Sequence, residues 1–136
     1  MAYMAIAVAD HREMLNRILQ DHGLRAEHLE LVPDVQAWCH KKGVEERSPN
    51  RQAKCFLNHD GTCQIVMLDR LTDDLIAGGK GGMSANGFLS EVETLDTDVK
   101  YLAHLMLHEV ACYVLRTTDQ EPRDTWAFER VARYAI

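Results

Sequence analysis

One apolar stretch near the C-terminus constrains the fold of this chain more than any other feature. Asp96 and Thr97 supply a helix cap, and the residues after them carry apolar side chains at helical spacing. These residues are Val99, Leu102, Ala103, Leu105, Met106, Val110, Val114 and Leu115. Because they cover a broad part of the helix surface, we expect this helix to lie at the centre of the protein.

Two further helices are predicted in the first half of the chain. Residues 10–22 repeat apolar side chains at helical spacing, and Pro33 begins a second helix that covers residues 35–42. Residues 25–31 favour no single element. Residues 45–52 are polar and predict a loop.

Residues 54–68 give the clearest hairpin signal in the chain. Asp60 and Gly61 separate two apolar runs, as in a two-residue turn. With that turn, Cys55 and Cys63 point to opposite faces of the hairpin, because side chains alternate along a strand. The register therefore argues against a shared metal site or a disulfide between these two cysteines.

The segment between the hairpin and the long helix is rich in glycine. Residues 78–87 contain five glycines, so we expect an irregular loop after at most a short helical turn at residues 75–77. The loop lacks the Gly-Lys-Ser/Thr ending of a phosphate-binding loop, which argues against a nucleotide site. After a connection at residues 117–123, residues 124–134 predict the last helix.

Length and composition favour one α+β domain. The 136 residues fit a single domain with a helical N-terminal part at residues 1–53. The hairpin, the glycine-rich loop, the long helix and the last helix then follow at residues 54–136. We expect a small antiparallel sheet packed on the long helix, with the other helices flanking it.

Charge and targeting signals indicate a cytoplasmic protein without nucleic-acid or membrane partners. The net charge is −6, so counterion release from DNA or RNA gives no binding energy. No apolar run approaches the length of a membrane span, and residues 1–9 lack the basic start of a signal peptide. We therefore expect the four cysteines to be reduced or bound to metal.

The long helix also carries the residues that suggest chemistry. His104, His108 and Cys112 are spaced four residues apart and stack along one face. In an HExxH helix, two histidines with this spacing bind zinc, and the glutamate after the first histidine activates a water molecule. Here the motif ends in cysteine, as His108-Glu109-Val110-Ala111-Cys112, and Asp124 follows at a plausible separation for a third ligand.

In this arrangement the second half of the chain resembles the ImmA/IrrE-type metallopeptidase domains, which have a zincin-like fold. The resemblance covers residues 54–136. Its matching residues are Asp60-Gly61, Ile65-Val66-Met67-Leu68, Leu107-His108-Glu109 and Asp124-Thr125-Trp126-Ala127. Members of that family cleave or bind regulatory proteins, and many are encoded by phages or other mobile elements.

The resemblance implies a zinc site and a peptidase activity. His108, Cys112 and Asp124 would be the zinc ligands, with His104 as an alternative ligand, and Glu109 would be the general base. Two positions depart from the family pattern, because Cys112 replaces a histidine and the acidic ligand is aspartate rather than glutamate. A thiolate ligand would also weaken the Lewis acidity of the metal.

Other interpretations of the same residues remain open. A domain of this fold without catalytic activity would act on a protein or peptide partner as a binding module. A third hypothesis is an enzyme of another class, in which Cys112 is a nucleophile beside His108. Structural roles also fit, with Asp124 as a helix cap and Cys112 as a small buried apolar residue.

Overall fold

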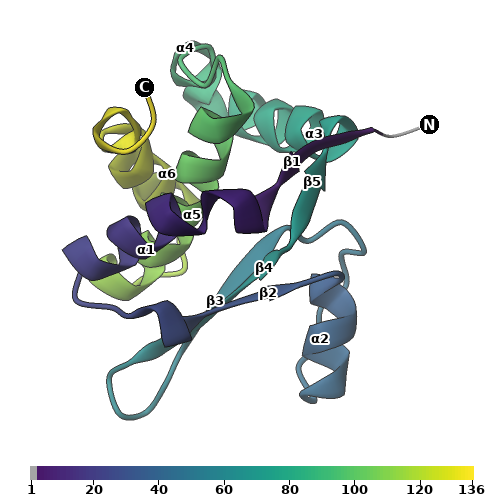
Figure 1. Ribbon diagram of the computed structural model, residues 1–136, viewed down its shortest axis with the longest axis vertical. Coiled ribbons are helices and arrows are strands. Elements are labelled where there is room, and N and C mark those ends of the chain that lie inside the picture. The colour runs from purple at the N-terminus through teal and green to yellow at the C-terminus, as the bar shows by residue number, and fades with distance from the viewer. Residues whose placement is uncertain (1–2) are drawn as a thin grey trace.

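A computed structural model describes residues 3–136 and has the expected α+β class (Figure 1). The strands are β1 (Met4–Ala7), β2 (Leu29–Val32), β3 (Ala53–Leu57), β4 (Cys63–Leu68) and β5 (Arg70–Thr72). The helices are α1 (Arg12–Asp21), α2 (Val35–Lys41), α3 (Asp73–Met83), α4 (Leu89–Val92), α5 (Asp98–Leu115) and α6 (Gln120–Phe128). The helices predicted at residues 10–22 and 35–42 correspond to α1 and α2.

The strands form two small sheets. The larger sheet has the order β2-β4-β3, in which β3 runs antiparallel to β4 and β2 runs parallel to it. The smaller sheet pairs β1 with β5. The N-terminal part of the chain thus contributes two strands besides its helices, and the larger sheet is mixed rather than antiparallel throughout. Met1 and Ala2 lie outside the described residues.

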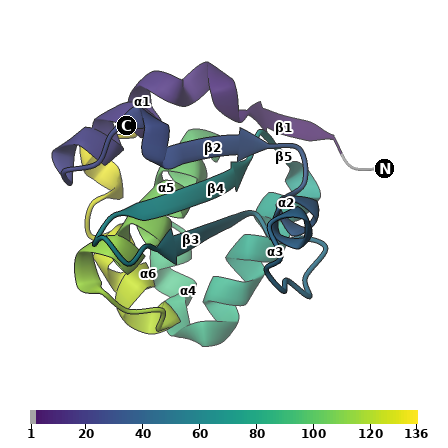
Figure 2. The same ribbon diagram turned by 90° about the horizontal axis from the view of Figure 1, so that it is seen from below.

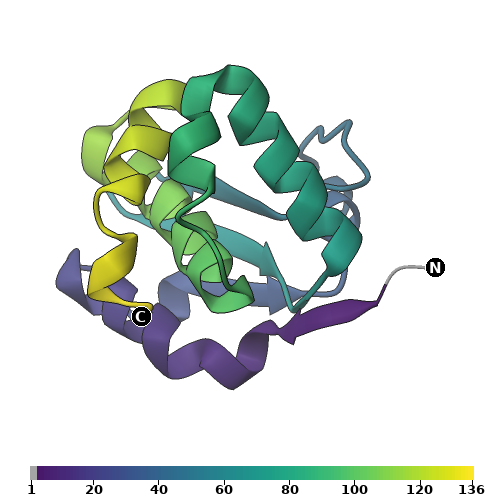
Figure 3. The same ribbon diagram turned by 90° about the horizontal axis from the view of Figure 1, so that it is seen from above.

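Helix α5 lies against the larger sheet at the centre of the molecule, as predicted (Figure 2). The Thr97 hydroxyl caps it by accepting a hydrogen bond from the Lys100 backbone N at 3.2 Å. Ten of its residues are buried, and it ends at Arg116 in a left-handed conformation. Seen from the opposite side, α3, α5 and α6 together cover one face of this sheet (Figure 3). None of the helices in residues 3–136 has the length and apolar character that crossing a bilayer requires.

The hairpin is present, but its predicted register is wrong by one residue. Cys55 pairs with Ile65 and Leu57 pairs with Cys63. The Asn58 backbone N donates to the Thr62 carbonyl at 2.8 Å, so three residues, 59–61, form the loop instead of two. Gly61 adopts a positive φ of 89°, as the last position of a three-residue hairpin loop requires. A shift of one residue reverses the face of every side chain on one strand, so Cys55 and Cys63 share a face.

The glycine-rich segment is helical, contrary to the prediction of an irregular loop. Helix α3 continues to Met83, and one wider turn at Ser84–Phe88 links it to α4. The Thr72 hydroxyl caps α3 by accepting a hydrogen bond from the Leu75 backbone N at 3.2 Å. A Cβ atom at Gly79 would clash with the Tyr101 side chain, so glycine allows α3 to pack closely on α5. Tertiary packing here outweighs low helix propensity.

The last helix begins earlier than predicted. Helix α6 starts at Gln120, so Asp124 lies inside the helix and is not its N-cap. The shift moves Asp124 to a buried position opposite α5, where it is 5% exposed. The alternative role of Asp124 as the cap of this helix is therefore wrong, since Asp119 holds the N-cap position.

Candidate functional site

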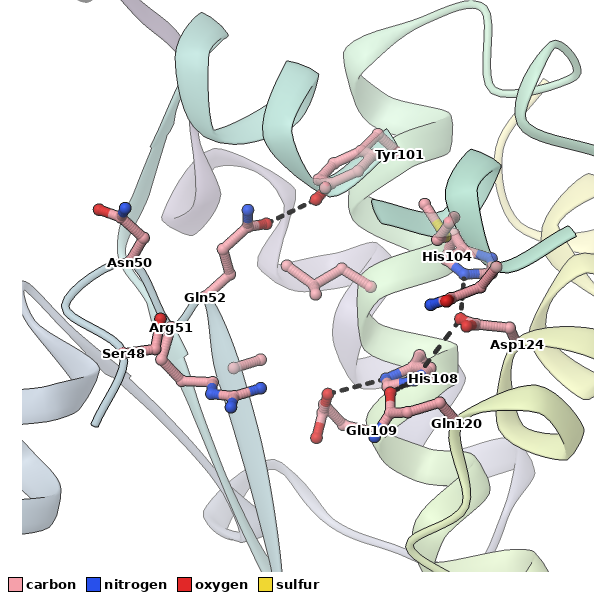
Figure 4. A pocket seen from close by; sticks show the side chains of 15 residues that line it. Ser48, Asn50, Arg51, Gln52, Tyr101, His104, His108, Glu109, Gln120 and Asp124 are labelled. Carbon is pink, nitrogen blue, oxygen red and sulfur yellow. Dashed lines mark hydrogen bonds and ion pairs between the residues drawn. The ribbon is translucent and has the colours of Figure 1, made fainter. Parts of the chain in front are cut away.

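A cavity of about 280 Å³ lies between α5, α6, α3 and the segment that leads into β3 (Figure 4). Its lining includes four of the five residues predicted to form a site, namely His104, His108, Glu109 and Asp124. The fifth, Cys112, does not line it. Most other lining residues are polar, including Gln52, Tyr101 and Gln120.

His104, His108 and Asp124 converge in this cavity (Figure 4). Asp124 Oδ1 lies 3.0 Å from His104 Nε2 and 3.5 Å from His108 Nε2. The two histidines are one turn apart on α5, and Asp124 reaches them from α6. The start of α6 at Gln120 gives Asp124 this position. The His108 Nε2 atom also lies 2.9 Å from Gln120 Oε1.

The two separations from Asp124 Oδ1 are close to the spacing of neighbouring ligand atoms around one zinc ion. Ligand atoms at about 2.0–2.1 Å from zinc in a tetrahedral site lie roughly 3.3 Å from one another. Within residues 3–136, no group of three or more His, Cys, Asp or Glu side chains has the geometry to hold a metal ion as the side chains lie here. The donor atoms instead contact each other and Gln120, so binding a metal would require these contacts to open.

Burial of His104 favours its neutral form. Burial lowers the pKa of His104, although the hydrogen bond and the charge of Asp124 act in the opposite direction. The neutral ring is thus favoured, and neutral imidazole is the form that binds metals. Its Nδ1 atom is buried and has no hydrogen-bond partner among the described residues.

Glu109 holds His108 in place rather than pointing freely into the cavity. Its carboxylate lies 3.0 Å from His108 Nδ1 and accepts a hydrogen bond from Arg123 Nη2 at 3.1 Å. Burial tends to raise the pKa of Glu109, but the hydrogen bond from His108 and the charges of His108 and Arg123 lower it overall. The group is therefore an anion that holds His108 through Nδ1, so that the other ring nitrogen, Nε2, faces Gln120 and Asp124.

Cys112 is buried outside the lining of the cavity. It is 1% exposed, and a hydrogen bond from Cys55 lowers its pKa to about 7 against the effect of burial. His108 and Cys112 were predicted to share one site, but only His108 lines the cavity. The second histidine of the cavity is His104, which was the predicted alternative ligand. In this register Leu105 occupies the position of the glutamate in an HExxH helix.

Two residues with defined roles at the site were not predicted: Arg123, which contacts His108 and Glu109 from behind the cavity lining, and Tyr101, which lines the cavity. Arg123 is 6% exposed and donates from Nε to the His108 carbonyl at 3.1 Å, which ties α6 to α5. Tyr101 donates from its hydroxyl to Gln52 Oε1 at 2.6 Å, and burial raises the pKa of Tyr101 to about 12. Tyr101 precedes His104 by three residues on α5, so helical spacing could have placed both side chains on one face.

Comparisons with known proteins do not assign the chain to a family. No family model, no curated protein and no solved structure matches it. The resemblance to ImmA/IrrE-type domains stays a prediction.

Proposed function

We propose that this protein is a zincin-like, zinc-binding domain whose ligands are His104, His108 and Asp124. The observation that carries the proposal is the position of Asp124 Oδ1, 3.0 Å and 3.5 Å from the two histidine Nε2 atoms. Two imidazoles and one carboxylate form a common donor set for zinc with one position left open. Bound there, zinc would supply a Lewis acid to an oxygen donor in the cavity.

The surroundings of these residues favour a peptide as the bound partner. Strand β3 is an outer strand of the larger sheet, and residues 50–52, which lead into it, line the cavity. An outer strand offers backbone groups to an extended peptide, which adds to the sheet as a further strand. A peptide paired with β3 would lie beside the cavity and present a carbonyl or carboxylate to the metal.

The geometry favours binding over hydrolysis. Hydrolysis by an HExxH helix needs a carboxylate after the first histidine, and Leu105 stands there. Glu109 is engaged by His108 and Arg123 within 3.1 Å, so it does not replace that carboxylate. We therefore propose a binding module that recognises a protein or peptide, with the metal as part of its recognition surface.

Metal content tests the ligand set. We expect about one zinc per chain by elemental analysis of tag-free protein, with loss of most of it in His104→Ala and Asp124→Ala. Cys112→Ser is the matched control and should retain the metal, because Cys112 does not line the cavity. Loss of zinc in Cys112→Ser together with retention in His104→Ala would refute this ligand set. An absence of zinc in the parent after refolding with excess zinc would refute the proposal itself.

A peptidase that uses Glu109 is the second candidate function. The observation in its favour is that Glu109 lines the same cavity as the three proposed ligands. The test is digestion of a mixed peptide library by the zinc-loaded parent and by Glu109→Gln. Cleavage by the parent that disappears in Glu109→Gln would establish the peptidase. If the parent leaves all peptides intact, the peptidase is excluded and the binding module is favoured.

A further inference from the structure

The wide turn between α3 and α4 contains an asparagine followed directly by a glycine, Asn86 and Gly87. Gly87 has a φ of 99° and a ψ of 5°, so the helical backbone is interrupted there. This φ lies in the left-handed region, which glycine adopts without steric cost. Wide helical turns of this type occur in proteins mostly as single turns. The bond between Asn86 and Gly87 therefore lies at a break between two helices rather than inside one.

Both residues are open to solvent. The Asn86 side chain is exposed, and it also lines the candidate cavity. A Cβ atom at Gly87 would meet no atom within 4 Å, so the space beside its backbone is open as well. Water can therefore reach the Asn86 carboxamide and the backbone N of Gly87.

Asn50 offers a matched comparison within the same chain. It too is exposed and lines the cavity, but the residue that follows it is Arg51. A side chain on the following residue hinders the approach of its backbone N to the asparagine carboxamide, and glycine removes that hindrance. Asn16 and Asn58 are likewise followed by residues that carry side chains. Among the asparagines of the sequence, the conditions for attack by the next backbone N thus meet at Asn86.

From this arrangement we propose that Asn86 is a site of spontaneous modification, at which its carboxamide becomes a carboxylate through a cyclic imide formed with Gly87. Asparagine is one of the thermolabile residues of proteins, and the only co-reactant is water. The product places a negative charge in the lining of the candidate cavity, to which Asn86 contributes a neutral group. The inference does not depend on zinc binding.

The reaction balances in two steps. The Gly87 backbone N attacks Asn86 Cγ, so a C–N bond forms and closes the imide ring. The bond from Cγ to Nδ2 breaks, and ammonia leaves with the proton of the Gly87 N–H. Water then adds to one imide carbonyl, and the C–N bond at that carbonyl breaks. Hydrolysis at Cγ gives aspartate, and hydrolysis at the backbone carbonyl gives isoaspartate. Overall, an amide and a water become a carboxylic acid and an ammonia.

The test is a site-resolved measurement in the full-length folded protein. The protein is incubated at physiological temperature in a mildly alkaline buffer made with oxygen-18 water, then digested and analysed by mass spectrometry. We expect a peptide in which the Asn86 amide has become an acid that carries labelled oxygen. Conversion at Asn86 should exceed that at Asn50 by at least roughly tenfold, because glycine puts no side chain beside the attacking nitrogen. Asn86→Gln should show far less conversion, because glutamine has to close a larger ring.

A synthetic peptide of residues 84–88 sets the time scale, since its chain is unrestrained. We expect conversion in the folded protein within roughly ten half-lives of the peptide reaction, because only one turn of the fold has to open. An Asn86 amide that outlasts this time would overturn the proposal. Equal conversion at Asn50 and Asn86 would also contradict it, because the following residue would then not matter. Both comparisons use the unsubstituted protein, so they do not depend on whether Asn86→Gln folds.

Isoelectric focusing gives an independent readout. The parent should accumulate a band of lower isoelectric point during the incubation, because each conversion adds a negative charge. Asn86→Gln is the control and should accumulate far less of this band. Equal accumulation of the acidic band in both proteins would show that the modification lies elsewhere in the chain.

Discussion

Arg123 Nη2 donates a hydrogen bond to Glu109 Oε1 at 3.1 Å, and both side chains are buried. The same guanidinium donates from Nε to the carbonyl of His108 at 3.1 Å. Arg123 therefore joins α6 to α5 at the turn that carries two residues of the cavity. The charge of Arg123 helps to lower the pKa of Glu109, and its hydrogen bond fixes the carboxylate that orients His108.

Removal of Arg123 should destabilise the protein strongly. The Arg123→Met variant leaves the Glu109 carboxylate buried without its cation, which costs about 3–5 kcal/mol of unfolding free energy. Urea unfolding followed by circular dichroism measures this loss. The double variant Arg123→Met, Glu109→Gln should recover part of it, because no unpaired charge remains. Equal stability of the single and double variants would contradict this account of the pair.

The stability should fall in acid through a second buried carboxylate, Glu46. Its Oε1 atom lies 3.0 Å from both Arg51 Nε and Lys54 Nζ. Burial raises the pKa of Glu46, but these partners and the Ser48 backbone N lower it to about 2. Because the folded pKa is below the unfolded value of 4.5, the stabilisation is complete above pH 4.5 and is lost as the pH falls toward 2.

Glu46→Gln should remove this pH dependence. We expect the variant to lose about 1–3 kcal/mol at pH 7 and to lose less than the parent between pH 4.5 and pH 2. Urea unfolding at a series of pH values gives both quantities. Glu45→Gln is the matched control, since the Glu45 pair with Arg47 is exposed and should contribute little. Parallel pH curves for the parent and Glu46→Gln would contradict the prediction.

The glycines of α3 should respond to alanine in opposite directions. Gly78→Ala and Gly81→Ala should stabilise the protein by roughly 0.5–1 kcal/mol each, because a Cβ at either position meets no atom within 4 Å. Gly79→Ala should destabilise it, because its Cβ would displace the Tyr101 ring. Thermal unfolding compares the three variants under one condition. Stabilisation by Gly79→Ala would show that α3 does not pack on Tyr101.

Zinc should stabilise the folded chain in proportion to its affinity. At a free zinc concentration 100 times the dissociation constant, we expect about 2.7 kcal/mol, with reversal by a chelator. Asp124→Ala should show no zinc-dependent shift in melting temperature. Glu109→Gln should need roughly 10–100 times more zinc for the same shift, because Glu109 orients His108. An equal zinc response in the parent and in Asp124→Ala would exclude the proposed ligand.

Sequence patterns identified the elements better than the contacts between them. The central helix, α1, α2 and the hairpin followed from periodicity and turn residues. The register of the hairpin did not, because Asp60-Gly61 fits loops of two or three residues, and one residue decides which face Cys55 occupies. Helix α3 was missed because its packing on Tyr101 has no local signature.

The sequence named four residues that line the candidate cavity, but it did not predict how they are grouped. Spacing of four residues placed His104, His108 and Cys112 on one helix face, and it could not tell which two share a cavity. That choice depends on Asp124, whose position inside α6 follows from a helix start four residues earlier than the sequence indicated. Arg123 was also missed, because burial of an arginine depends on partners distant in sequence.

Helix α3 forms one wall of the cavity, so its helical stability should depend on whether a ligand is bound there. Gly79 and Met83 line the cavity from a helix that is rich in glycine and therefore close to the coil state when isolated. A ligand that contacts Gly79 and Met83 only when α3 is helical must therefore stabilise the helix, because unfolding of α3 would cost the binding free energy. Backbone amide exchange in α3 would consequently report occupancy of the cavity without a label on the ligand.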